Sequence, residues 1–348
     1  MKQSGSTNRI RLVLVAFGAA LFLCSCSREG IQNSINPAGP NAANLDRLWW
    51  LMFWVCTAVY VLTMIAIFIA IRNGTRRRDL NPVLDPSPET ERRKRNAVVS
   101  AVVVTTAILF FFLIYSYSTG RALTADLAHK NGLSIEVTGH QWWWEVRYND
   151  VDASNMFTTA NEIHIPVGVP VLFTLRGGDV IHSFWVPNLA GKKDLIPGKI
   201  STMWLQADKP GVYRGQCAEY CGLQHARMAF WIVAEPQDQF NAWRQNAVQA
   251  AVPPSTDSQR YGQQVFLSAP CVMCHAISGT PAGSNFGPNL THIGSRNTIA
   301  AATLSNTREH LTRWIVDSQQ FKPGNKMPAN NLGQKELDAL VDYLQSLK

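Results

Sequence analysis

The sequence carries little net charge once two short segments are set aside. The formal charge at pH 7 is +8, but residues 1–25 contribute +3 and residues 72–95 contribute +4. Only +1 remains for the rest of the chain. Because a protein that binds nucleic acid needs a basic face, this distribution excludes nucleic acid as a partner. The sequence pI near 9.2 instead reflects where two basic segments lie relative to a membrane.

Internal repeats and long low-complexity tracts are also missing. The 348 residues are therefore divided among ordinary domains, and they suffice for two soluble domains plus membrane segments. Apolar residues make up 46% of the chain, an ordinary share that is unevenly spread. The uneven spread predicts separate membrane and soluble regions.

The N-terminus predicts export. Lys2, Arg9 and Arg11 precede an uncharged run, LVLVAFGAALFL, that is too short to span a bilayer comfortably. The run leads into Leu-Cys-Ser-Cys, which resembles a bacterial lipobox. We interpret residues 1–25 as a lipoprotein-type signal peptide, with a lipid anchor on the sulfur of Cys26. An uncleaved signal anchor is the alternative.

Two long apolar runs follow an external segment at 26–47. The first has 24 uncharged residues and the second has 22, so we expect transmembrane helices over 48–71 and 96–118. The intervening loop, 72–95, has eight Lys and Arg against four acids and is expected to face the cytoplasm. Both ends of the mature chain then lie outside, which predicts a bacterial inner-membrane protein with periplasmic soluble domains.

The soluble part divides into two regions. Short β-rich runs separated by Gly, Pro, Asp and Asn predict an all-β sandwich or barrel from about residue 130, within a domain that we assign to 119–236. Residues 237–256 predict a short helix and a proline-containing linker. The pattern is then helical over 257–348 and ends in an amphipathic helix.

A first cysteine pair lies in the stretch GQCAEYCGLQHARM. A disulfide between Cys217 and Cys221 suits an oxidising compartment but leaves His225 and Met228 unexplained. Zinc is a second interpretation, because the upstream His182 would complete a Cys2His2 set. Thiolate, imidazole and thioether together suit copper. A blue-copper ion uses one thiolate, so the second thiolate indicates two copper ions.

This stretch, preceded by DVIHSFWVP, resembles the binuclear CuA domain of cytochrome c oxidase subunit II, a cupredoxin β-barrel. The membrane hairpin before the barrel is also similar to that family. The resemblance implies copper coordination by five side chains and by the backbone carbonyl of Glu219. The five side chains belong to His182, Cys217, Cys221, His225 and Met228.

The same resemblance implies further roles. The Glu219 side chain would reach a magnesium site shared with subunit I. Trp142, in GHQWWWEVRY, would be the residue through which an electron enters CuA, and on a strand it would share a face with Trp144. The family often begins its second membrane helix with Glu-Ile-Ile-Trp at the mouth of a proton path. This chain has ERRKRNAVVS there, with Glu89 and Glu91 as the nearest carboxylates, so the resemblance does not carry a proton path to this position.

The second cysteine pair lies in CVMCH, a c-type haem attachment sequence. Cys271 and Cys274 would hold the porphyrin by thioethers while His275 binds iron. A redox CxxC or a disulfide with an unrelated histidine is the alternative. Export and a surrounding domain of suitable size favour haem c.

The C-terminal region resembles small cytochromes c of the class I type. This resemblance implies that Met327, in a Pro/Gly-framed loop before the last helix, is the axial methionine, with His292 and His310 as rival ligands. It also implies that Pro288, in GPNLTHIG, packs near His275.

The predicted fold is multidomain, with a two-helix transmembrane hairpin, an all-β cupredoxin barrel and an all-α cytochrome c domain. Oxidase subunits II with a fused cytochrome c belong to the caa-type group. The resemblance implies electron flow from a cytochrome c-type donor through one covalent haem c and two CuA coppers to the oxygen-reducing haem–copper centre of subunit I, coupled to proton translocation. Subunits I and III and the bilayer would be its partners. A subunit of a nitrogen-oxide reductase and a lipid-anchored copper–haem electron carrier are the alternatives.

Overall fold

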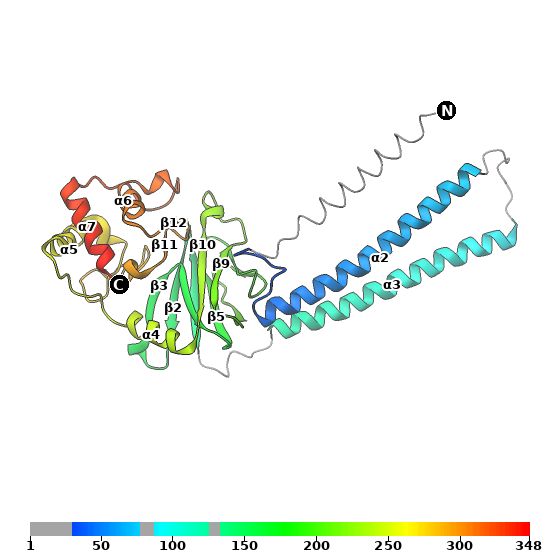
Figure 1. Ribbon diagram of the computed structural model, residues 1–348, viewed down its shortest axis with the longest axis horizontal. Coiled ribbons are helices and arrows are strands. Elements are labelled where there is room, and N and C mark those ends of the chain that lie inside the picture. Colours follow the sequence, from blue (N-terminus) through cyan, green and yellow to red (C-terminus); the bar gives the residue numbers. More distant parts are fainter. Residues whose placement is uncertain (1–29, 77–86, 125–132) are drawn as a thin grey trace, which may run out of the picture.

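The computed structural model describes residues 30–76, 87–124 and 133–348. It consists of a helical hairpin, a β-sandwich and a small helical domain, which lies at the end of the sandwich away from the hairpin (Figure 1). This arrangement confirms the predicted multidomain fold. The leader with Cys26, and residues 77–86 of the basic loop, lie outside the described residues.

The hairpin is formed by α2 (Pro40–Arg76) and α3 (Pro88–Thr124). Each helix begins at a proline, which suits the first helical turn because the missing N–H would have no helical partner there. Each has 37 residues, or about 55 Å, and so extends beyond the expected spans at both ends. Both helices are long and apolar enough to cross a membrane, and their apolar windows are not buried within the chain. Side chains of this kind need a bilayer around them.

The segment before α2 is attached to the sandwich. The Ala38 N–H donates to the Asn188 carbonyl at 2.7 Å, and the Asp208 N–H donates to the Ala38 carbonyl at 2.7 Å. In the first turn of the helix, the side-chain amide of Asn41 donates to the Trp204 carbonyl at 2.7 Å. These bonds fix the first membrane helix to the copper-binding region predicted from the sequence.

The sandwich consists of two five-stranded sheets. The first has the order β3-β2-β1-β5-β8, with β1 (Ser134–His140), β2 (Trp143–Asn149), β3 (Phe157–Ala160), β5 (Val171–Gly177) and β8 (Ser201–Leu205). The second has the order β4-β10-β9-β6-β7, with β4 (Glu162–Pro166), β6 (His182–Trp185), β7 (Lys193–Leu195), β9 (Gly211–Cys217) and β10 (Ala229–Glu235). Each sheet has one parallel pair, β1–β5 and β4–β10, and its other pairs are antiparallel.

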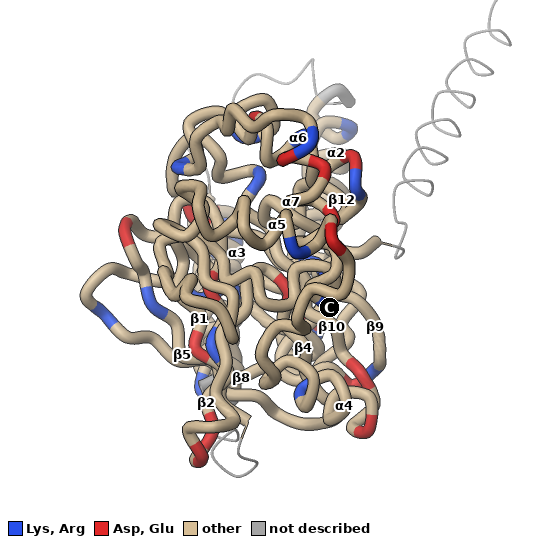
Figure 2. Tube along the Cα trace, turned by 90° about the vertical axis from the view of Figure 1, so that its left-hand side faces the viewer, with Lys and Arg blue, Asp and Glu red and all other residues tan. Residues whose placement is uncertain are grey.

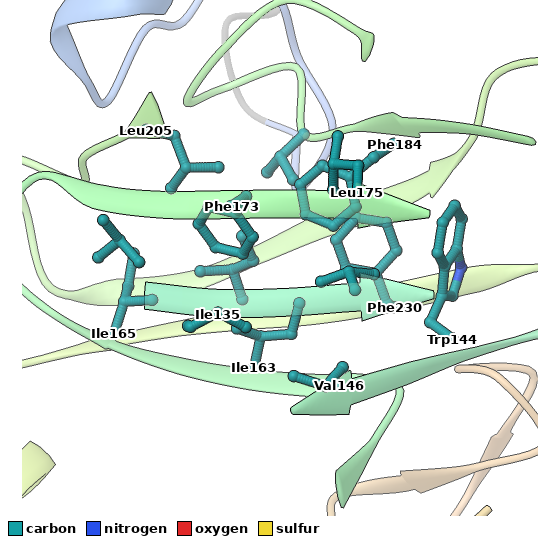
Figure 3. Packing of buried hydrophobic residues seen from close by; sticks show 14 of the residues in the cluster. Ile135, Trp144, Val146, Ile163, Ile165, Phe173, Leu175, Phe184, Leu205 and Phe230 are labelled. Atoms are coloured by element: carbon teal, nitrogen blue, oxygen red, sulfur yellow. The ribbon is translucent and has the colours of Figure 1, made fainter. Parts of the chain in front are cut away.

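The core lies between the two sheets, where alternate side chains of each strand point inward (Figure 3). Its aromatic end is built from Trp144, Phe184 and Phe230, with ring centroids 4.5 Å apart for the two phenylalanines and 5.2 Å for Trp144 and Phe230. The Trp144 ring also lies 6.1 Å from the ring of His182. The rigid aromatic core therefore supports one of the predicted copper ligands directly.

The helical domain follows α4 (Gln237–Ala247) and a connecting segment, 248–256. Its elements are α5 (Asp257–Ser268), the short pair β11 (Thr298–Ile299) and β12 (Leu304–Ser305), α6 (Arg308–Val316) and α7 (Gln334–Ser346). The predicted amphipathic face of α7 is buried in the core of this domain, with Leu337, Leu340, Val341 and Leu344. Only short one-turn helices and loops separate these elements, so the Cys-Val-Met-Cys-His stretch and the Met327 loop lie outside the longer helices.

Candidate metal centres

Three segments bring the first predicted ligand set to one end of the sandwich. His182 begins β6, and Cys217 ends the neighbouring strand β9. Cys221, His225 and Met228 lie on the connection from β9 to β10, which includes the short helix η3 (His225–Arg227). The ligand atoms of His182, Cys217 and Cys221 all lie within 4.8 Å of one another.

The distances between donor atoms favour a shared metal over a disulfide. Cys217 Sγ lies 3.8 Å from Cys221 Sγ and 3.9 Å from His182 Nδ1. Cys221 Sγ lies 3.7 Å from His225 Nδ1 and 3.8 Å from Met228 Sδ. A disulfide requires about 2.05 Å between sulfurs. Donors bonded to one ion at about 2.0–2.3 Å are themselves roughly 3.3–3.8 Å apart in tetrahedral geometry, so these side chains fit metal ions.

Glu219 lies between the two cysteines and contributes its backbone to the cluster. Its carbonyl oxygen is 3.2 Å from Cys217 Sγ. Its carboxylate does not enter the cluster and instead accepts the Tyr220 N–H at 3.2 Å. The backbone carbonyl of Glu219 therefore lies at the cluster, while its carboxylate lies outside it.

The two cysteines influence each other's protonation. The hydrogen bond from Cys221 lowers the pKa of Cys217 far below the ordinary thiol range. The hydrogen bond to Cys217, together with burial and the charge of that thiolate, raises the pKa of Cys221. A second thiolate is therefore unfavourable without a cation, and bound metal would allow both sulfurs to lose their protons.

Asp179 orients His182 and was missed from the sequence. Its Oδ1 lies 2.8 Å from His182 Nε2, and its Oδ2 accepts the Gln141 N–H at 2.7 Å. Burial raises the pKa of Asp179, but the hydrogen bonds from His182, Gln141 and Val180 outweigh it and hold the pKa well below its usual range. A carboxylate on the far nitrogen fixes the orientation of a histidine ligand. Asp179 could have been identified from the sequence, because it stands three residues before His182 in DVIH.

Replacing Asp179 by asparagine should weaken copper binding by about 10- to 100-fold, as loss of an outer partner of a metal ligand does. The amide has no charge, and it leaves His182 freer to turn. Copper titration of the metal-free chain, followed by absorption, measures the effect. Asp208→Asn is the control because its exposed carboxylate pairs with Gln206. Wild-type affinity in Asp179→Asn would contradict the orienting role.

Trp142 does not lie on a strand, contrary to the expectation from the sequence. Together with Gln141 it forms the turn that joins the paired residues His140 and Trp143, and its carbonyl accepts from Lys322. Its ring is buried, and Nε1 donates to the Cys221 carbonyl at 3.0 Å. Gly222, at φ +115°, permits this approach, since a Cβ there would lie 3.0 Å from the Trp142 ring. Trp142 thus contacts the backbone of a predicted copper ligand.

The second cysteine pair lies on the short helix η4 (Pro270–Met273) and directly after it. His275 Nδ1 lies 2.7 Å from the Pro288 carbonyl, the neighbour that the resemblance implies. Burial lowers the pKa of His275, and this hydrogen bond opposes it only in part, so the imidazole is neutral. Among the described residues, none is hydrogen-bonded to His275 Nε2. This nitrogen is therefore free to bind iron.

Two further observations test whether this domain fits a haem. A Cβ on Gly287 would lie 2.8 Å from His275 Cε1, so only glycine leaves the imidazole its present position. The buried guanidinium of Arg296 donates to the Asn289 carbonyl, but its Nε has no hydrogen-bond partner among the described residues. A buried cation with an open donor suits a group that carries carboxylates, as haem does. Arg296 was missed from the sequence, where a lone arginine gives no spacing signal.

The loop that carries Met327 is fixed by side chains. The Met327 N–H donates to Asn325 Oδ1 at 2.8 Å, and the Met327 carbonyl accepts from Ser318 Oγ at 2.7 Å and Gln319 Nε2 at 2.9 Å. These bonds hold both the N–H and the carbonyl of Met327 in place. A fixed backbone suits a residue that must present its sulfur in one position.

The rival histidines are differently placed. Both ring nitrogens of His292 face backbone carbonyls, those of Lys348 at 3.1 Å and Gln249 at 3.2 Å. His310 Nδ1 faces the Ser305 carbonyl at 3.0 Å, in the first turn of α6. His292 therefore has no free nitrogen for iron, and the assignment of Met327 stays a prediction.

Comparison with known proteins agrees with these features. Residues 152–235 match the family "Cytochrome C oxidase subunit II, periplasmic domain", and residues 259–348 match the family "Cytochrome c". Cytochrome c oxidase subunit 2 of Alkalihalophilus pseudofirmus is 37% identical over 335 residues, which cover 94% of each chain. The subunit 2 of Bacillus sp. strain PS3 is 35% identical over 239 residues, 66% of each chain. A solved periplasmic domain of subunit II from Bradyrhizobium japonicum is 32% identical, covers 35% of this chain and 96% of that one, and has a TM-score of 0.32.

The fold and the two sites define a membrane-anchored electron-transfer subunit that uses copper and haem c. The chain belongs to the cytochrome c oxidase subunit 2 family and carries a fused cytochrome c domain. It is therefore a subunit of a haem–copper oxidase.

Proposed function

We propose that this subunit admits electrons to a caa-type terminal oxidase. They pass from a cytochrome c-type donor through haem c and binuclear CuA to the oxygen-reducing centre of subunit I, with coupled proton translocation. The haem would be held by Cys271, Cys274, His275 and Met327. The copper ions would be held by His182, Cys217, Glu219, Cys221, His225 and Met228. The observation that carries the proposal is the spacing of sulfur and nitrogen donors around Cys221, between 3.7 and 3.8 Å.

The chain's own residues hold the copper ligands rigid. The Trp144 ring packs against the His182 ring, and Asp179 holds His182 Nε2 in place. The Cys221 carbonyl accepts from Trp142 Nε1 and from Gln141 Nε2, at 3.0 and 2.8 Å. Groups that are already in place need not reorganise when charge moves, which favours fast transfer in both directions.

Partners follow from the same proposal. Subunit I would receive the electron, share a magnesium site with the Glu219 carboxylate and, with subunit III, surround the helical hairpin. A lipid on Cys26 would add a second attachment to the bilayer. The helical domain has eight Lys and Arg against six acids, and both signs are interspersed on the end of the molecule seen in Figure 2. The donor is therefore not selected by one strongly charged face.

Topology provides one test. We expect trypsin added to intact spheroplasts to cut exposed sites after Ser118 but to leave residues 72–95 whole, because their excess of Lys and Arg retains them in the cytoplasm. Mass spectrometry of the fragments reads the result, and permeabilised spheroplasts, in which the loop is cut, are the control. Cleavage within the loop of sealed spheroplasts would reverse the orientation.

The function itself is tested on the purified complex. Metal analysis should give about three copper ions per complex, two from this chain and one from the haem–copper centre of subunit I, and EPR should show the shared-electron signal of the two in this chain. Pyridine haemochrome analysis should give one haem c per chain, and the complex should consume oxygen. Reduction of nitric or nitrous oxide without oxygen uptake would instead identify a nitrogen-oxide reductase. Purification without a large haem-containing membrane subunit would identify a free electron carrier.

A further inference from the structure

The helical domain, which would hold the haem and is called the haem domain below, contacts the sandwich through the loop that precedes Met327. The sandwich, which would hold the copper ions, is called the copper domain. We call residues Phe321–Lys326 the docking segment. Lys322 in this segment is only 3% exposed. Its Nζ lies 2.8 Å from the Trp142 carbonyl, 2.9 Å from the Arg227 carbonyl and 3.3 Å from the Ala300 carbonyl. An ammonium has three donors, so all three are used, two of them across the domain boundary.

Neighbouring contacts extend this interface over the copper-ligand connection. The buried Gln224 side chain donates from Nε2 to the Pro323 carbonyl at 2.6 Å, and the Arg227 guanidinium donates to the Phe321 carbonyl. Gln224 directly precedes His225, and Arg227 directly precedes Met228. The connection that presents copper ligands and the loop that presents Met327 are therefore held against each other.

A third contact reaches the outer partner of His182. Lys326, directly before Met327 in the chain, places Nζ 3.5 Å from Asp179 Oδ2, while Asp179 Oδ1 lies 2.8 Å from His182 Nε2. Lys326 is exposed, so this ion pair adds little binding free energy. It does show that the haem domain also approaches Asp179, the outer partner of His182.

The backbone between β11 and β12 is also unusual at this interface. Ala300, Ala301 and Ala302 have φ values of 56°, 57° and 56°, a left-handed conformation that L-residues other than glycine rarely adopt. The Ala301 carbonyl accepts the Ala229 N–H of the copper domain at 3.3 Å, and the Ala300 carbonyl accepts from Lys322. Strain of this kind persists where surrounding contacts determine it, and these contacts include the domain interface.

Burying the amine of Lys322 in this position also costs free energy. Burial lowers the pKa of the Lys322 amine to about 7, because a charged group loses its hydration there. A connection that only tethered two domains would need neither the buried amine nor the left-handed turn. Both features fix one relative position of the domains.

We propose that the docking segment holds the haem domain over Trp142, and that Lys322 is a positioning residue for electron transfer from haem c to copper. This inference rests on the proposed function. The step moves one electron and no atom: ferrous haem iron becomes ferric as the copper pair is reduced by one electron. Trp142 is 8% exposed, and its carbonyl is bonded to Lys322. An external protein donor is therefore excluded from Trp142 and must deliver its electron to the haem domain.

Amine labelling of the assembled wild-type oxidase tests the docking without relying on activity. In a short reaction with an acylating reagent, we expect Lys335 and Lys326, which are exposed, to be modified, and Lys322 to react at least about tenfold more slowly because its amine is enclosed. Peptide mass spectrometry measures each site. Equal labelling of Lys322 and Lys335 would overturn the proposal.

Variants test the consequence for electron transfer. Lys322→Met keeps the length of the side chain but removes its donors, and should lower the docking equilibrium by about tenfold or more, the factor that corresponds to 1.4 kcal/mol. After flash reduction of haem c, transfer to copper should slow, and amide hydrogen exchange should rise in residues 222–229 and 321–326. Lys335→Met is the matched control, on the exposed face of α7.

The outcomes separate this inference from the function on which it rests. A Lys322→Met oxidase with both cofactors, wild-type transfer rate and wild-type exchange would exclude the positioning role while leaving the proposed function intact. Absence of haem-to-copper transfer in the wild-type oxidase would instead contradict the function. If Lys322→Met does not assemble, Gln224→Leu, which removes the hydrogen bond to the Pro323 carbonyl, should raise the exchange of residues 321–326, and no rise would count against the docking.

Discussion

Replacing Cys221 by serine should abolish the two-copper EPR signal. Cys221 Sγ is the centre of the ligand set, within 3.8 Å of donors from Cys217, His225 and Met228. A hydroxyl is a hard and weakly acidic ligand, which suits copper poorly. Loss of this ligand should reduce copper affinity by more than the roughly 10- to 100-fold expected for an outer partner. Oxygen uptake driven by the natural donor should be lost with the copper.

The measurement combines copper content, EPR and oxygen uptake of the purified complex. Cys217→Ser should give the same result, since both sulfurs are needed to bridge two ions. Cys56→Ser is the matched control, because Cys56 is a free, exposed cysteine on α2, outside the sandwich. A Cys221→Ser oxidase that kept a normal signal and rate would show that the sulfurs do not bind copper.

Replacing Met327 by alanine should lower the reduction potential of haem c without detaching the haem. The thioether links and His275 remain, but the sixth position of iron opens to water or to an added ligand. A thioether favours ferrous iron, so its loss shifts the potential downward, within the range of about 0.8 V that axial ligands cover. A high-potential donor then reduces the haem poorly, and donor-driven oxygen uptake falls.

Redox titration and carbon monoxide binding measure these changes. A small reductant that reaches copper directly should still support oxygen uptake in Met327→Ala, which separates loss of donor reduction from loss of the copper site. Met273→Ala is the control, since Met273 is 69% exposed and lies inside the attachment motif. An unchanged potential without carbon monoxide binding would show that Met327 is a loop residue. It would make His310 the candidate, because His292 already contacts two carbonyls.

The sequence predicted the parts of the molecule whose signal is local. Cys217, Cys221, His225 and Met228 lie within one short stretch, so their residue types and spacing indicate shared chemistry before any fold is known. The order of strands in the two sheets is not local, and no periodicity indicates it. The ends of α2 and α3 also differ from the expected spans, because a helix continues wherever its backbone bonds are satisfied, whereas only its membrane part must be apolar.

The features that sequence reasoning missed depend on tertiary contacts. Lys322 looks like an ordinary surface lysine in FKPGNK, but it is buried where the two soluble domains meet. Trp142 was expected on a strand, but it lies in the turn that joins the paired residues His140 and Trp143. A run of β-prone residues does not by itself show where a hairpin turns.

The segment that joins the two soluble domains has a kinetic consequence. Residues 248–256 are nine residues between α4 and α5, a length that reaches at most about 30 Å when fully extended. Even an undocked haem domain would therefore remain near copper at an effective concentration of the order of millimolar. On the proposed path, delivery of each electron from haem c to copper would be a unimolecular event, independent of the donor concentration and little affected by ionic strength. Donor concentration and ionic strength would then affect only the rate of the first encounter, between the donor and the haem domain.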